Sequence, residues 1–156
     1  MLRFRRTLPL SLLLLLALAA LPASAQKADD DKKAEEQPAF REYKGIKLGM
    51  AAAEVRKLLG NPADKGDAQD LFTFGESETA QVFYDNSHNV SAISISYIGD
   101  VNKAPTAKVV LGSEAEAKPD GSLYKMIRYP KAGYWVSYFR TSGDSPMVMV
   151  AVQKIQ

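Results

Sequence analysis

The stretch "GIKLGMAAAEVRKLLGNP" at residues 45–62 decides how the folded part of this sequence begins. Its centre consists mostly of alanine, leucine, glutamate, arginine and lysine, which favour an α-helix, and its apolar side chains recur at helical spacing. Gly60 suits a left-handed helix stop, and Pro62 cannot continue a helix. We therefore predict a short helix over residues 51–59, preceded by an extended segment and a tight turn at Gly49.

Two glycines in front of a helix raise the question of a phosphate-binding loop. Such a loop needs a lysine and a hydroxyl residue at the helix start, but Gly49 is followed by Met50 and then by alanines. A dinucleotide-binding loop needs G-x-G-x-x-G inside a βαβ unit, whereas three residues separate Gly45 from Gly49. The sequence therefore argues against a nucleotide site, and we interpret Gly49 as a turn residue.

Three segments rich in β-branched and aromatic residues follow the helix, at 70–74, 80–85 and 90–97. They nearly alternate between apolar and polar residues, and the sequences between them are turn-like, which is typical of an antiparallel meander. The second half has the same plan, with a helix expected over 104–112 and strands expected in "SLYKMIRYP", "GYWVSYFR" and "PMVMVAVQ".

The Leu-Gly pair that ends the first predicted helix recurs at the end of the second, at an offset of 52 residues. Because the order of elements also recurs, we predict a tandem repeat covering about 45–98 and 103–155. The expected fold class is α+β. In each repeat a short helix precedes an antiparallel meander of three to four strands, and the helices pack on one face of the sheet.

The N-terminal residues have the features of a targeting segment. Residues 1–25 combine three early arginines, a leucine-rich core and "ASA" in front of Gln26, which predicts a cleaved signal peptide. A retained membrane anchor is the alternative, but the apolar run is short for a bilayer crossing. Residues 26–39 are charged and nearly free of large apolar side chains, so we expect a flexible tether there and a folded domain over 40–156.

Composition narrows the functional classes. The chain has no cysteine, so neither disulfides nor a lipid-carrying cysteine are available, and we expect no stable membrane anchor. Removal of the signal takes three of the 20 Lys and Arg residues, which leaves 17 against 18 Asp and Glu. This near-neutral net charge does not indicate binding to nucleic acid or to an anionic lipid surface.

No catalytic or metal-binding pattern stands out. The single histidine, His88, lies in "DNSHN", which is expected to be an exposed hairpin tip. Asp64, Asp67 and Asp70 recur every third residue, whereas a calcium loop places acids at every second position and ends in glutamate. We therefore expect no enzyme, metal or cofactor, although a pair of carboxylates acting as acid and base stays open as an alternative.

The strands carry more aromatic and methionine side chains than a core alone requires. Successive strand residues point to opposite faces, so the strand residues that do not face the helices form an open face. A face of this composition is typical of a protein-binding surface. The alternative is that a different register, or the tether, makes these residues core. The candidate residues are Phe83, Lys125, Trp135, Phe139, Met147 and Met149.

The opening stretch, together with "FTF", "VFYD" and "VSAISI", resembles the SmpA/OmlA outer-membrane assembly lipoprotein domain. It is also similar to the repeats of secreted beta-lactamase inhibitor proteins. The shared features are a Gly-Met turn into a short helix, a closing Leu-Gly-x-Pro and antiparallel strands. This chain departs from the lipoproteins in lacking their cysteine, and Ala51 stands where that family usually has a helix-capping Thr or Ser.

The inhibitor resemblance implies that a concave sheet face and two protruding turns contact the partner. Here that would involve Trp135, Phe139 and Lys125, with the turns at "GESE" and "PKAG" nearby. No inhibitory residue carries over one by one.

From these observations we predict a non-catalytic exported protein, periplasmic or secreted, that binds another protein through the open face of the sheet. A role in envelope or outer-membrane assembly is the narrower expectation. The alternatives are an enzyme inhibitor and, from a different class, a small ligand-binding protein or hydrolase. The oligomeric state stays open.

Overall fold

A computed structural model describes residues 38–155. The predicted signal peptide, residues 1–25, and nearly all of the predicted tether, residues 26–39, lie outside this part of the chain. Within residues 38–155, no helix has the length and apolar character needed to cross a membrane.

The described residues form seven strands and two α-helices. In chain order these are α1 (Ala52–Leu59), β1 (Asp64–Lys65), β2 (Gln69–Phe74), β3 (Glu78–Tyr84), β4 (Val90–Ile98), a 3₁₀ turn η1 (Val101–Lys103), α2 (Ala107–Leu111), β5 (Leu123–Tyr129), β6 (Tyr134–Arg140) and β7 (Met147–Lys154).

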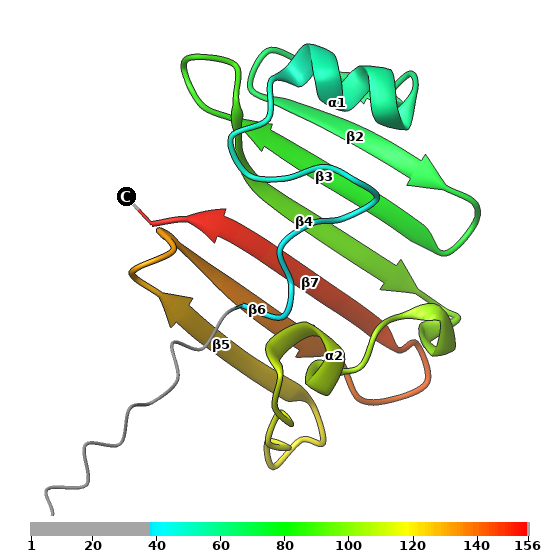
Figure 1. The fold of residues 1–156 in the computed structure, drawn as a ribbon. Helices are drawn as coiled ribbons and strands as arrows, with labels where there is room; N and C mark the ends of the chain where they lie inside the picture. Colours follow the sequence, from blue (N-terminus) through cyan, green and yellow to red (C-terminus); the bar gives the residue numbers. More distant parts are fainter. Residues whose placement is uncertain (1–37, 156) are drawn as a thin grey trace, which may run out of the picture. The chain divides into compact units, whose positions relative to one another are not determined.

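All seven strands belong to one antiparallel sheet in the order β1-β2-β3-β4-β7-β6-β5 (Figure 1). After β4 the chain passes through η1 and α2 to the far edge, and it then returns through β5 and β6. This path places β7 beside β4, where Ile93 pairs with Val152 and Ile95 pairs with Val150. The last strand therefore joins the two meanders at the centre of the sheet.

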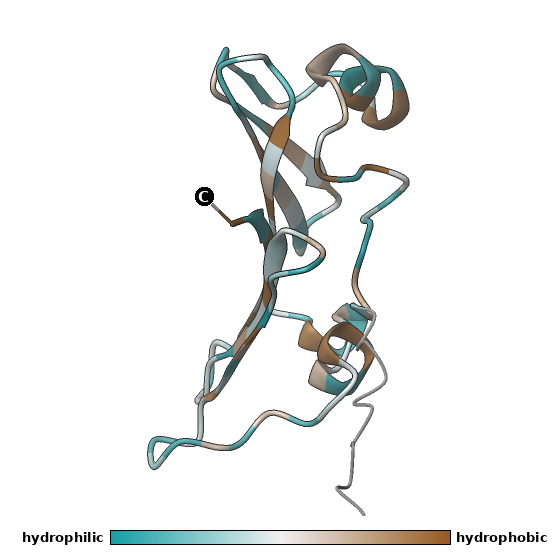
Figure 2. Ribbon diagram, turned by 60° about the vertical axis from the view of Figure 1, so that its left-hand side comes forward, coloured by the Kyte–Doolittle hydropathy of each residue, from teal (hydrophilic) through white to brown (hydrophobic). Residues whose placement is uncertain are grey.

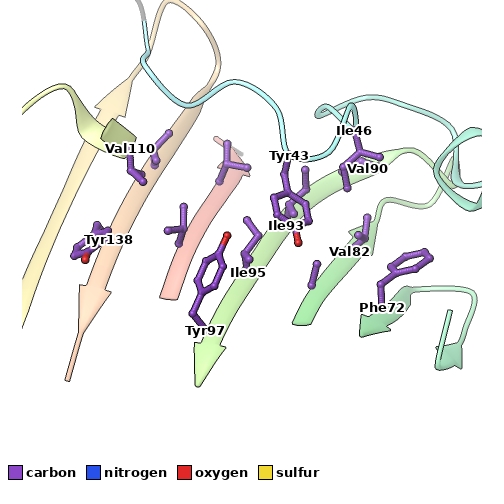
Figure 3. Close-up of a cluster of buried hydrophobic side chains, with 14 of the residues drawn as sticks. Tyr43, Ile46, Phe72, Val82, Val90, Ile93, Ile95, Tyr97, Val110 and Tyr138 are labelled. Carbon is purple, nitrogen blue, oxygen red and sulfur yellow. The ribbon is translucent and has the colours of Figure 1, made fainter. Parts of the chain in front are cut away.

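One face of the sheet carries the core. Its aliphatic side chains alternate along the strands with partly exposed ones, as the period of two requires. Figure 3 shows such side chains projecting from the same face of neighbouring strands. Burying a valine, isoleucine or phenylalanine side chain contributes about 1.5–3 kcal/mol each. The strand residues that are at most 2% exposed include Phe72, Val82, Ile93, Ile95, Val136, Val150 and Val152.

Much of this face is covered by irregular chain, residues 38–51, which we call the crossing segment (Figure 1). A two-residue hairpin fixes its middle, since Tyr43 and Ile46 exchange backbone hydrogen bonds of 3.0 and 2.9 Å. Lys44 and Gly45 between them have φ angles of 47° and 83°. Such a turn requires positive φ at both positions. The hairpin buries Ile46 completely and leaves Tyr43 only 7% exposed.

Backbone hydrogen bonds dock the end of the crossing segment on the start of β4. Gly49 N donates to Val90 O at 2.8 Å, and Val90 N donates to Met50 O at 2.8 Å. Gly49 has φ of 86°, which explains why glycine stands at this turn. The predicted turn at Gly49 therefore connects the crossing segment to α1.

The predicted tandem repeat of a helix and a meander, with helices packed on one face, is wrong. Residues 38–155 form a single seven-stranded sheet with two short helices of eight and five residues. Figure 2, with the sheet nearly edge-on, shows how little of it such short helices can span. The recurrence at 52 residues misled because alanine, leucine and glycine recur at short helices generally. In a tandem arrangement the first strand of the second meander would also lie next to β4. In this structure that strand, β5, lies at the far edge of the sheet.

The helix ends explain the lengths of the two helices. Ala51 occupies the N-cap of α1 with extended backbone and offers no side-chain cap, while the Glu54 carboxylate accepts a 3.3 Å hydrogen bond from Ala51 N. In α2 the Thr106 hydroxyl accepts from Val109 N at 3.3 Å, and Gly112 ends the helix with φ of 72°. The second helix is thus shorter than the predicted 104–112.

Candidate functional site

The strand register separates a covered face from an open face of the sheet. On the covered face Val82, Ile93, Val152 and Val136 form one continuous row across four strands. The open face is the opposite one, and three rows of paired residues run across it. From β2 to β5 these rows are Gln69–Phe83–Ala92–Gln153–Trp135–Arg128, Leu71–Gln81–Ser94–Ala151–Ser137–Met126 and Thr73–Thr79–Ser96–Met149–Phe139–Tyr124.

The two halves of the open face differ in chemistry. On β2, β3 and β4 the rows carry mostly threonine, serine and glutamine, as expected for a sheet face turned to water. On β5, β6 and β7 aromatic and methionine side chains replace them. We call Tyr124, Met126, Trp135, Phe139, Met147 and Met149 the apolar cluster.

Members of the apolar cluster are accessible to different degrees. Tyr124 and Met126 on the edge strand β5 are each 42% exposed, and Ile98, which pairs with Met147 beside the cluster, is 55% exposed. Trp135 and Phe139 are partly buried. Ser137 lies between these two rings on β6, so a small side chain separates two large ones. A partner could therefore contact rings from above without first opening the core.

The charge around the cluster is basic. Arg128 pairs with Trp135 across β5 and β6 and is exposed. The ammonium of Lys118 lies 5.1 Å from the centroid of the Tyr124 ring, within cation–π range. No residue of the three rows on β5, β6 and β7 is acidic.

The structure brings together four of the six residues singled out from the sequence. Trp135, Phe139, Met147 and Met149 share the open face on the adjacent strands β6 and β7. Phe83 lies on the same face but is three strands from Trp135, about 14 Å at the usual strand spacing.

Lys125 is not on the open face. It pairs with Tyr138, which is 3% exposed on the covered face, and its ammonium donates to Ser113 Oγ at 2.9 Å and to Glu114 O at 3.0 Å. The prediction failed because β5 is an edge strand with only Tyr129 fully buried, so its sequence defines its inward face weakly.

Sequence reasoning missed Tyr124 and Met126, the most exposed members of the cluster. Both flank Lys125 in sequence, so assigning that lysine to the wrong face hid them. The apolar pairing of Tyr124 with Phe139 across β5 and β6 is the signal that could have revealed them.

The two turns expected beside the binding face are also far from each other. Residues 75–77 follow β2 beyond the row that contains Thr73, whereas residues 130–133 follow β5 beyond the row that contains Arg128. These rows lie at opposite ends of the strands. The two turns therefore do not protrude together beside the apolar cluster.

A buried ion pair lies behind the other half of the sheet. The Asp70 carboxylate is fully buried and accepts hydrogen bonds from Arg56 Nε at 2.8 Å, from an Arg56 terminal nitrogen at 3.0 Å and from the Tyr84 hydroxyl at 2.7 Å. Gly66 N donates a fourth at 3.3 Å. Burial alone would raise the pKa of Asp70, but the bonds from Arg56 and Tyr84 outweigh it and lower this pKa.

This network engages both oxygens of Asp70, so that carboxylate is not available as an acid, a base or a calcium ligand. Asp70 faces Arg56, with both of its oxygens occupied and no solvent access. Within residues 38–155 no group of three or more acidic, histidine or cysteine side chains is arranged to hold a metal ion. His88 is exposed with φ of 56° in the turn between β3 and β4. The ion pair instead ties α1 to β2 and β3.

Comparisons with known proteins bear on the fold only. No protein-family model matches this chain, and no curated protein matches it. Among solved structures it is similar to a DUF4309 family protein (YjgB) from Bacillus subtilis subsp. subtilis str. 168, with a TM-score of 0.50 and 13% identity. The match covers 77% of this chain and 89% of that one. The resemblance to assembly lipoproteins and inhibitors stays a prediction.

Proposed function

We propose that this chain is an exported, non-catalytic module that binds another protein through the apolar cluster on the open face of its sheet. The observation that carries this proposal is the contrast between the two halves of that face. Threonine, serine and glutamine make up most of this face on β2 to β4, with Leu71 and Phe83 as the large apolar exceptions, whereas Tyr124, Met126, Trp135 and Phe139 lie together on β5 and β6.

A protein partner accounts for this contrast better than folding does. The buried core lies on the covered face and contains no member of the apolar cluster. The rings and thioethers of the cluster are therefore not needed to form that core. Tryptophan, tyrosine, phenylalanine and methionine are the types enriched at the centres of protein interfaces. Arginine is enriched there too, and Arg128 lies next to Trp135.

The basic rim defines the chemistry of the partner. Arg128 and Lys118 border an apolar surface that carries no acid, so the complementary surface is apolar with carboxylates at its margin. Association through such a rim should slow as salt rises, because screening weakens electrostatic steering.

The predicted signal peptide supports a periplasmic or secreted location for this binding. A role in envelope assembly rests on the resemblance alone. The geometry does not support the inhibitor alternative, because the two turns expected to contact a target enzyme lie at opposite ends of the strands.

The test begins with a photo-crosslinking amino acid placed at Tyr124 in a cell that exports the chain. The matched control places it at Val109, an equally apolar position that is 65% exposed on α2, away from the open face. We expect a discrete adduct from position 124 and none from 109. Equal labelling at both positions would contradict the proposal.

Affinity for the captured partner then tests individual side chains. Truncating Trp135 or Phe139 to alanine should weaken binding by about 2 kcal/mol or more if they are hot spots. Leu58→Ser, at an exposed apolar residue of α1, should leave it unchanged. Unaltered affinity in both ring variants would refute the assignment of the cluster as the binding surface.

A further inference from the structure

A second candidate site lies on the covered side of the molecule, where the crossing segment meets the start of β6. A surface pocket of about 450 Å³ opens there. That volume is within the range that small-molecule sites occupy in proteins. Three separate stretches line it: the crossing segment, the β5–β6 turn with the start of β6, and the end of β7.

Three cations converge on this pocket. Arg41 and Lys47 come from the crossing segment, and Lys154 comes from β7. None of the described residues that line it is acidic. The charge of Arg41 also acts on the Tyr134 hydroxyl, since burial raises the pKa of Tyr134 and Arg41 partly opposes that rise.

Two of these cations form weak ion pairs with acidic residues outside the pocket. Glu42 pairs with Lys47 at 3.2 Å, and Asp85 pairs with Lys154 at 3.2 Å, with all four side chains more than a third exposed. Such solvent-exposed pairs are weak and leave ammonium donors available. An anion in the pocket could therefore bind both lysines without breaking a strong internal interaction.

The remaining wall is apolar. Leu48 and the Tyr134 ring line the pocket beside the cations, and the Tyr129 ring lies behind Tyr134 at a centroid distance of 5.8 Å. Because cationic and apolar walls meet in one pocket, the matching ligand has an anionic group on an apolar body.

We propose that this pocket binds a small organic anion, with its carboxylate or phosphate group on Lys47 and Lys154 and its apolar body against Leu48 and Tyr134. The inference is independent of the open face, since the pocket contains none of the apolar cluster.

The experiment is an NMR titration of the full chain with three probes. Sodium benzoate and phenyl phosphate each carry an anionic group on a ring, whereas benzyl alcohol keeps the ring and lacks the charge. We expect both anions to shift the Ala132 and Gly133 amides saturably, with dissociation constants on the order of 1 mM. The tighter of the two identifies the preferred head group. Benzyl alcohol should bind at least tenfold more weakly.

Variants test the residues assigned to the anionic group. Lys47→Gln combined with Lys154→Gln should weaken benzoate binding about tenfold or more, because both charged donors are lost. Lys57→Gln combined with Lys108→Gln removes the same charge from exposed helix positions and should leave binding unchanged. Thermal melts without ligand establish that each variant is folded.

Several results would overturn the proposal. These are the absence of saturable shifts at Ala132 and Gly133 with either anion, equal binding of benzyl alcohol, or full affinity in the Lys47 and Lys154 variant. A parallel titration with inorganic phosphate adds one more test, because equally tight binding of that ion would mean that the apolar wall contributes nothing and would overturn the proposal.

Discussion

Replacing Arg56 by methionine tests the buried ion pair directly. Methionine keeps the helix propensity of α1 and most of the apolar stem, but it removes two hydrogen bonds to the Asp70 carboxylate and one to Gly66 O at 3.0 Å. Breaking a buried pair by deleting one partner costs roughly 3–5 kcal/mol. The Arg56 side chain is 28% exposed, and Tyr84 and Gly66 still bond Asp70, so the lower end applies. We expect a loss of about 3 kcal/mol.

The assay is urea unfolding followed by far-ultraviolet circular dichroism, with Lys57→Met as the control on the same helix. At a typical dependence of 1–3 kcal/mol per molar urea, Arg56→Met should lower the midpoint by about 1–3 M. The control residue is exposed and should change the midpoint little. A loss below about 1 kcal/mol in Arg56→Met would refute the argument that this pair ties α1 to the sheet.

Acid provides an independent check on the same variant. The folded-state pKa of Asp70 lies below its unfolded value, so its contribution to stability is complete above about pH 4 and disappears as pH falls through the folded pKa. Without Arg56, burial dominates and raises the folded pKa of Asp70, so stability should rise on protonation instead. The difference in unfolding free energy between parent and variant should therefore shrink below about pH 4. A constant difference down to pH 3 would contradict this account of the charge.

Three further predictions concern other parts of the fold. Ala51→Ser should supply the missing cap of α1 and raise the free energy of unfolding by about 1 kcal/mol, whereas Ala53→Ser inside the helix should not; equal effects would contradict the cap. Burial and Glu78 raise the pKa of Tyr97 to about 12. Unfolding titrations should therefore show stability falling above about pH 10, where only the unfolded tyrosine ionises, and Tyr97→Phe should flatten that fall; parallel curves would exclude it. Lys125→Val removes an inward charge from an edge strand and should increase concentration-dependent association in light scattering; unchanged scattering would contradict a protective role for this lysine.

Local pattern predicted the elements of this chain well. Helix-forming residues between Gly49 and Gly60 indicated α1 to within a residue, and alternation in β3 and β4 indicated which side chains are buried. Both signals act over a few residues, within one element, so a single sequence contains them.

The arrangement of those elements could not be read in the same way. The pairing of β4 with β7 joins residues 49 to 61 positions apart, from Ile98 with Met147 to Ala92 with Gln153, and no local pattern specifies it. The extended segment before α1 was predicted, but its path across the sheet, which buries Tyr43 and Ile46, was not. Asp70 begins the predicted strand 70–74 and shares its inward face with Phe72, and that parity could have predicted a buried charge in need of a partner.

The position of β7 also determines when the protein can fold. During synthesis β2, β3 and β4 emerge first, but the free edge of β4 waits for a neighbour that comes more than 45 residues later. At about 5–20 residues per second, the ribosome exposes that apolar edge for several seconds. Until Lys154 has been made, the two meanders have no strand to connect them. Until then β4 presents an unpaired, apolar edge, which is the kind of surface that chaperones bind.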